Sequence, residues 1–220
     1  MADEWKQPRK VNAGGDGTGR RVWRAGKAAS TQGSREVIVR VTGRTKGAGG
    51  LQAQLSYMTR KGELSGEHST GRVLHGMDDM RALRERWVAD NAAYAWHPSC
   101  NTQSVGIVLS MPNGTPVETV REATRVWAQE HISPTTEWFA VQHTDRNHYH
   151  SHVAVRAVQV DGYRVRPTLP DIQEWRETFA RSLREQGVNA IATPRREKLE
   201  RILALRQELR QERYPPLLHL

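Results

Sequence analysis

Apolar and polar positions alternate along some segments of the chain and recur at helical spacing along others. Alternation predicts strands at residues 36–41, 102–110, 138–142 and 150–155. Helical spacing predicts helices at residues 51–58, 79–94, 116–131 and 171–186, the last one capped by Asp171 and ended by Gly187. The order of these elements predicts an α+β fold in which helices flank a central antiparallel β-sheet.

Composition divides the chain into three parts. Residues 1–34 are rich in Gly, Ser, Lys and Arg and predict a flexible basic arm. Through Arg35, 8 Lys and Arg against 3 Asp and Glu give +5 of the formal net charge of +9. Residues 35–196 carry the periodic segments and form the predicted folded domain, and residues 197–220 form a charged C-terminal helix or tail.

The excess of basic over acidic residues points to a polyanionic partner. The net charge of +9 and the sequence pI near 10.2 make nucleic acid the first candidate. Residues 43–50 read as a basic, glycine-rich loop of the kind that lies along phosphates, with Arg44 and Lys46 as its cations. No long apolar run favours membrane insertion, no apolar leader is visible, and Cys100 is the single cysteine, so a cytoplasmic protein is expected.

Four of the nine histidines fall within residues 143–152. Side chains two apart on a strand share a face, so His150 and His152 lie side by side. The turn residues at 145–147 predict a hairpin, which brings His143 opposite them. Three imidazoles that converge in this way make a divalent-metal site with open coordination positions, as catalysis requires. Imidazole ligands by themselves favour Zn²⁺, Co²⁺ or Ni²⁺.

Two other interpretations of this cluster stay open at this point. One is a histidine-rich surface hairpin without a ligand. The other is a structural metal site, although such sites usually close with a fourth ligand, often cysteine, and Cys100 is far away in sequence. Tyr57 also has two interpretations. Because it lies one position off the apolar stripe of its helix, the helical pattern alone predicts a partly buried helix residue. The residues Thr59, Arg60 and Lys61 that follow it make a functional role the other interpretation.

Three segments together resemble the signature motifs of conjugative relaxases, members of the HUH endonuclease group. The histidine cluster resembles the three-histidine motif, and residues 36–41 with 55–64 resemble the nucleophile motif. Residues 104–112, followed by Gly114, are similar to the middle motif. The motifs resemble those of the MobA/VirD-like branch, which includes the endonuclease of T-DNA borders, and the resemblance spans roughly residues 36–196.

The resemblance implies a role for each matching residue. Tyr57 is the implied nucleophile, Asp145 orients a histidine or assists deprotonation of the tyrosine, and His143, His150 and His152 hold the metal. Implied DNA contacts come from Arg44, Lys46, Arg60, Lys61, Ser110 and Asn113. The family suggests Mg²⁺ or Mn²⁺ as the ion. Ser151 stands where the family places a bulky apolar residue between two histidines, so looser packing is expected behind the site.

The implied function is metal-dependent nicking and rejoining of one DNA strand, with a 5′-phosphotyrosyl intermediate and a free 3′-OH. The implied substrate is single-stranded or supercoiled DNA at an origin of transfer or a border-like site. Implied protein partners are an accessory DNA-binding protein and a type IV secretion coupling protein. Two alternatives are a catalytically silent DNA-binding domain of the same fold and a metal-dependent hydrolytic nuclease that forms no covalent intermediate.

Overall fold

The computed structural model describes residues 35–95, 101–112, 114–144 and 149–194, together with 197, 200, 203 and 204. Its strands are β1 (Arg35–Glu36), β2 (Ile38–Lys46), β3 (Gly66–His68), β4 (Val73–Leu74), β5 (Thr102–Ser110), β6 (Trp138–His143), β7 (His150–Arg156) and β8 (Ala190–Ile191). Its helices are α1 (Gly47–Met58), α2 (Gly76–Tyr94), α3 (Val117–His131) and α4 (Leu169–Glu185). The predicted basic arm lies outside the described residues.

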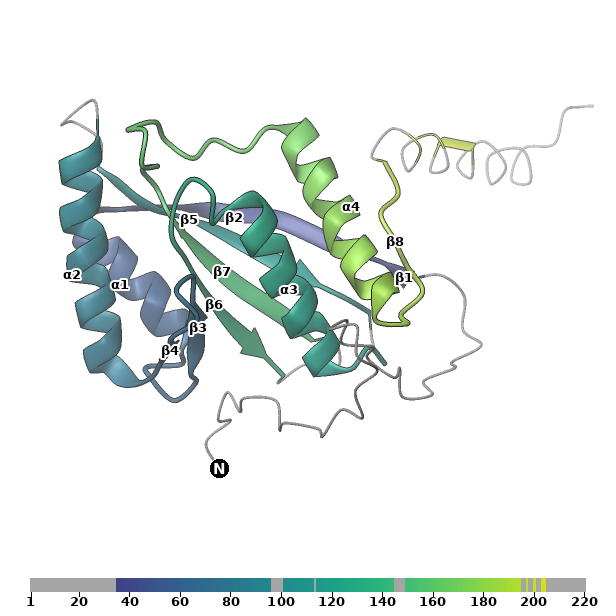
Figure 1. Cartoon of the computed structure of the whole chain (residues 1–220), viewed down its shortest axis with the longest axis horizontal. Helices are drawn as coiled ribbons and strands as arrows, with labels where there is room; N and C mark the ends of the chain where they lie inside the picture. The colour runs from purple at the N-terminus through teal and green to yellow at the C-terminus, as the bar shows by residue number, and fades with distance from the viewer. Residues whose placement is uncertain are drawn as a thin grey trace, which may run out of the picture.

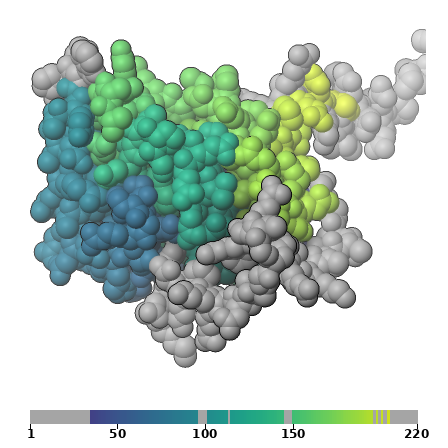
Figure 2. Space-filling view, in the orientation of Figure 1, coloured from purple at the N-terminus to yellow at the C-terminus, as the bar shows by residue number. Residues whose placement is uncertain are grey.

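A six-stranded sheet in the order β2-β5-β7-β6-β3-β4 forms the centre of the fold, and every neighbouring pair is antiparallel. Helices α3 and α4 cross one face of it, whereas α1 and α2 lie side by side on the other (Figure 1). The predicted α+β class with a central antiparallel sheet is therefore confirmed. In the space-filling view, α3 (teal) fills the middle of the visible face between α2 (blue) and α4 (yellow-green) (Figure 2).

Side chains of the central strands point alternately to the two faces of the sheet, and each face has its own hydrophobic core. On β6, Trp138 and Ala140 belong to the core under α3 and α4, whereas Phe139 and Val141 belong to the core under α1 and α2. Because each central strand is covered on both faces, its residues are almost all buried. The register of the sheet therefore decides which polar side chains of these strands reach the surface.

The glycine-rich segment 43–50 is not a loop, which corrects the sequence-based prediction. Residues 43–46 continue β2, and α1 begins at Gly47 rather than at Leu51. The backbone N–H of Gly47 donates to the carbonyl of Asn101 at 2.8 Å, and Leu51, Leu55 and Met58 are buried against the sheet. Tertiary packing thus outweighs the low helix propensity of the glycines.

Three smaller differences also follow from local bonding. Strands β3 and β4, not predicted from the sequence, are too short to show alternation. Helix α2 begins at Gly76 rather than at residue 79. Thr168, not Asp171, caps α4: its hydroxyl accepts from the Asp171 N–H, and the Asp171 carboxylate accepts from the Thr168 N–H at 2.7 Å.

The carboxylate of Glu137 ties α2 to the sheet. Its Oε2 accepts hydrogen bonds from His68 Nε2 at 3.1 Å, from Arg86 Nη2 at 2.9 Å and from Trp87 Nε1 at 2.8 Å. The bond from His68, assisted by Trp87 and the charge of Arg86, lowers the pKa of Glu137 to about 2. Three donors on two separate elements therefore depend on one ionised side chain.

We expect this carboxylate to make stability depend on pH. Because its folded pKa lies below the unfolded value of 4.5, its contribution is present above about pH 4.5 and is lost as the pH falls towards 2. At pH 7, Glu137→Gln should lower the free energy of unfolding by roughly 2 kcal/mol, a figure reduced for partial exposure, and should flatten the decline between pH 4.5 and 2. Urea unfolding across this pH range measures both effects.

Glu130 provides the matched control, because its exposed carboxylate pairs with Arg181 on the surface. Glu130→Gln should change the free energy of unfolding by no more than about 0.5 kcal/mol. Equal losses in the two variants would show that the Glu137 cluster contributes no more than a surface ion pair.

Candidate metal and nucleophile site

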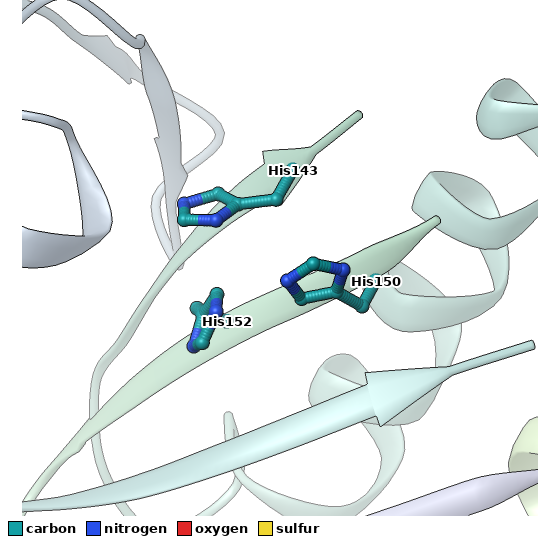
Figure 3. A group of neighbouring side chains, drawn as sticks. All are labelled: His143, His150 and His152. Carbon is teal, nitrogen blue, oxygen red and sulfur yellow. The ribbon is translucent and has the colours of Figure 1, made fainter. Parts of the chain in front are cut away.

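Three histidines meet where β6 ends and β7 begins. His143 pairs directly with His150, and His152 follows two residues later on the same face of β7. Their rings lean towards one another (Figure 3), and one ligand nitrogen from each lies within 4.8 Å of the other two. His143 is buried, whereas His150 and His152 are half-buried. The convergence predicted from the spacing of the histidines is therefore present.

A backbone hydrogen bond fixes the ring of His143. Its Nε2 lies 2.7 Å from the carbonyl oxygen of Met58, the last residue of α1. A carbonyl oxygen only accepts, so Nε2 carries the proton and Nδ1 keeps the lone pair that a metal requires. Metal-binding histidines commonly donate their second nitrogen in this way.

Tyr57 lies beside the histidines in the last turn of α1. Its ring centroid is 5.5 Å from that of His152, with the ring planes at 89°, and 6.3 Å from that of His143. The side chain is 64% exposed. Tyr57 is therefore an exposed residue of its helix and not the partly buried one that one interpretation of the sequence suggested.

The turn after Tyr57 has an uncommon backbone conformation. Arg60 and Lys61 adopt positive φ angles of 50° and 58°, and Gly62 follows at 90°. Each non-glycine residue in this region costs about 1–2 kcal/mol. The hydroxyl of Thr59 accepts from the Gly62 N–H at 3.2 Å, and the Leu64 N–H donates to the Thr59 carbonyl at 2.8 Å. These bonds hold the two basic residues next to the tyrosine.

The structure brings only some of the predicted DNA contacts to this site. Ser110 pairs directly with His150, and Arg60 and Lys61 lie in the turn after Tyr57. Arg44 pairs with Val105, which belongs to the core under α3 and α4, so Arg44 lies on the opposite face of the sheet. Lys46 pairs with Thr102, at the end of β5 away from Ser110.

Asp145 and Asn113 lie outside the described residues. Their predicted roles in proton transfer and DNA contact remain predictions. The contact that the sequence analysis missed is the carbonyl of Met58, a backbone group for which the side-chain pattern carries no signal.

Ser151 does not leave loose packing behind the histidines, as its small size suggested. It is 2% exposed on the face of β7 opposite His150 and His152. The Thr124 hydroxyl of α3 donates to Ser151 Oγ at 2.8 Å, and the Ser151 hydroxyl donates to Gln142 Oε1 at 2.7 Å. A chain of polar contacts thus takes the place of an apolar side chain and links α3 to both histidine-bearing strands.

The donor set suits a divalent ion. One nitrogen from each of the three imidazoles lies within 4.8 Å of the other two, close enough for the three to share one ion. Three protein ligands leave coordination positions open for substrate, as in catalytic rather than structural sites. His143, His150 and His152 are therefore the residues that could hold a metal.

An antiparallel α+β fold that presents a three-histidine centre beside an exposed tyrosine defines the class of a relaxase-type nuclease domain. Comparison with known families agrees: the profile of the relaxase family described as "MobA/VirD2-like, nuclease domain" matches residues 57–188, more than half of the chain. The chain belongs to this family. The match begins at Tyr57 and includes all three histidines.

Individual relatives are consistent with the family. The T-DNA border endonuclease VirD2 of Rhizobium radiobacter is 29% identical over 141 residues, which cover 58% of this chain and 33% of the relative. The VirD2 proteins of Rhizobium rhizogenes and Agrobacterium fabrum are each 28% identical over 141 residues and 32% of their length. The chain thus matches about a third of the length of these relatives.

Removing one histidine should weaken metal binding. In either His150→Ala or His152→Ala, an ion loses one of three protein ligands, so the dissociation constant for Co²⁺ should rise at least tenfold. Isothermal titration measures it, and visible absorption reports the ligand geometry. His75→Ala, which removes an exposed imidazole at the start of α2, should leave the affinity unchanged. Wild-type affinity in the His152 variant would contradict the ligand assignment.

Substitution of Gly62 should disturb the turn after Tyr57. A Cβ at Gly62 would lie 2.9 Å from the backbone nitrogen of Met77, in addition to the strain of φ 90°. Gly62→Ala should therefore lower the free energy of unfolding by about 2–4 kcal/mol. Gly71→Ala separates the two causes, because Gly71 has φ 79° but open space around its Cβ, and it should cost only about 1 kcal/mol. Similar losses in a urea titration would rule out the steric contact.

Proposed function

We propose that this domain nicks and rejoins one strand of DNA at a specific site, with Tyr57 as the nucleophile and a divalent ion on His143, His150 and His152. The observation that carries the proposal is the position of an exposed tyrosine ring 5.5 Å from the ring of a candidate metal ligand. Membership of the relaxase family supports the same chemistry. The curated relatives are named as border endonucleases, which suggests an origin of transfer or a border-like sequence as the target.

In the proposed reaction, Tyr57 Oη attacks the phosphorus of the scissile phosphodiester and loses its proton to a base, for which Asp145 is the candidate. The bond from phosphorus to the 3′ oxygen breaks, and that oxygen takes up a proton to become a free 3′-OH. The 5′ side remains esterified to Tyr57, so the bond energy is kept and the reverse attack rejoins the strand. A bound divalent ion would relieve negative charge on the non-bridging phosphate oxygens.

Several residues of the chain prepare this step. The bond from His143 Nε2 to the Met58 carbonyl holds the metal site next to the nucleophile. Arg60 and Lys61 supply positive charge to the backbone of the DNA, and Ser110 contacts it from the end of β5. The basic residues of the arm at 1–34 add phosphate contacts that carry no sequence information.

The proposed ion is Mg²⁺ or Mn²⁺, with Zn²⁺, Co²⁺ and Ni²⁺ as competing binders that imidazoles favour. Transfer of the nicked strand would require an accessory DNA-binding protein and a type IV secretion coupling protein, with the cytoplasm as the compartment. Within the described part of the chain, no helix combines the length and apolar character that a membrane crossing requires.

Substitution of Tyr57 tests the proposal directly. Tyr57→Phe removes only the attacking oxygen, so nicking of a supercoiled plasmid from the protein's own genetic neighbourhood should fall by at least a thousandfold. The covalent protein–DNA adduct, detected on a denaturing gel, should disappear, while DNA affinity and thermal stability stay close to wild type. Metal-dependent hydrolysis would instead leave nicking intact in this variant, with no adduct in either protein.

Two tyrosines serve as controls. Tyr149 packs against the core under α3 and α4, away from the histidines, and Tyr94 is 47% exposed at the end of α2. Their Phe variants should nick at wild-type rates. If the adduct still forms in Tyr57→Phe but is lost in the Phe variant of Tyr149 or Tyr94, that tyrosine and not Tyr57 is the nucleophile. DNA binding without nicking by the wild-type protein would favour a silent DNA-binding domain.

A further inference from the structure

The outer strand β2 contributes a basic residue to the histidine face of the sheet. Directly paired residues on antiparallel strands share a face, and one such row joins Val141, His152, Val108 and Arg40 across β6, β7, β5 and β2. Arg40 therefore lies on the same face as His152, two strands away. At the usual strand spacing, the two Cα atoms are separated by about 10 Å.

A β-bulge gives the two arginines of β2 opposite orientations. Val41 pairs with Ile107 and Gly43 pairs with Gly106, so Thr42 is an extra residue in β2. In an unbroken strand, Arg40 and Arg44 would share a face because they are four residues apart. The bulge instead places Arg44 opposite Val105, in the layer under α3 and α4.

Gly106 makes room for this bulge. A Cβ at Gly106 would lie 2.6 Å from Thr42 Oγ1 and 2.8 Å from Gln54 Nε2, so a larger residue would require the side chains of Thr42 and Gln54 to move. The face on which Arg40 lies is set by the pairing of β2 with β5, in which Arg40 is directly opposite Val108.

The guanidinium of Arg40 is available to an external anion. Arg40 is exposed and forms no ion pair with any residue that the structure describes. By contrast, the arginines paired with carboxylates on the helices α2, α3 and α4 are Arg81, Arg84, Arg86, Arg121, Arg125, Arg176 and Arg181. In the row of paired residues, the half-buried Val108 lies between Arg40 and His152, and Ser110 lies two residues further along β5.

We propose that Arg40 binds the DNA phosphate next to the scissile one, so that the strand crosses β7, β5 and β2 in this order. The inference rests on the proposed function, because it takes the scissile phosphate to lie at the histidine centre. The long side chain of Arg40 covers much of the separation of about 10 Å, and a guanidinium binds a phosphate through two parallel hydrogen bonds. Arg40 acts as a positioning residue and takes no part in bond breaking.

The first test compares Arg40→Ala with Arg44→Ala, using a fluorescein-labelled oligothymidine of 25 nucleotides and anisotropy at several salt concentrations. Arg40→Ala should weaken binding about tenfold and reduce the slope of log K against log salt by about 0.7, the value for one phosphate contact on a single strand. Arg44→Ala, which removes the same charge from the same strand, should stay within twofold of wild type. Arg40→Lys keeps the charge and should restore the slope.

The second test locates the phosphate. On the oligonucleotide that the wild-type protein nicks, a neutral methylphosphonate replaces each phosphate near the cleavage point in turn. At one position next to the scissile phosphate, wild type should lose about tenfold in affinity, and Arg40→Ala should lose nothing further. Thermal unfolding of both variants should match wild type, which excludes a structural cause.

The outcomes separate the two ideas. If the wild-type protein nicks DNA but Arg40→Ala and Arg44→Ala behave alike, the role of Arg40 is overturned and the proposed function stands. If the wild-type protein binds the oligothymidine but nicks nothing, the proposed function fails, and the contrast between the two variants still decides whether the strand crosses Arg40. If it binds no single strand, both ideas fail.

Discussion

A hydrogen bond from a histidine ring to a backbone carbonyl connects the two halves of the candidate site. His143 belongs to β6 and Met58 ends α1, and the bond of 2.7 Å between His143 Nε2 and the Met58 carbonyl joins elements that are 85 residues apart in the chain. It selects the tautomer of His143 and simultaneously fixes the end of the helix that carries Tyr57. A shift of α1 along the sheet would therefore disturb His143, a candidate metal ligand, and Tyr57 together, which couples their geometry.

The histidine centre depends on register, because a slip of one residue in β7 would turn His150 and His152 to the opposite face. That face is occupied by the core under α3 and α4, where Val153 and Val155 are buried. The Ser151 hydroxyl, bonded to Thr124 and Gln142, adds a directional constraint to the same register. Apolar packing on one face of β7 thus determines the position of the histidine side chains on the other face.

Sequence reasoning reached the class of the fold and the three histidines, because both follow from periods that the backbone imposes. It missed β2 beyond Val41, since Gly43 and the basic residues Arg44 and Lys46 resemble a loop unless the pairing with β5 is known. The separation of Arg40 from Arg44 depends on a bulge in β2 next to Gly43, whose partner Gly106 is 63 residues away in the chain. These features arise from the pairing of segments that are distant in the chain, so no local sequence pattern predicts them.

The site combines strained and unstrained backbone in a consistent way. The three candidate metal ligands lie on regular strands within the sheet, where their geometry requires no unusual torsion angles. The strain lies in the turn of Arg60 and Lys61, directly after Tyr57. Thr59 bonds and the contact of Gly62 with the start of α2 hold that turn, so the stability of the surrounding fold offsets its cost. The proposed in-line attack on a phosphodiester requires that the histidine centre and the basic turn beside Tyr57 both be held in place, because the angle of approach tolerates little displacement.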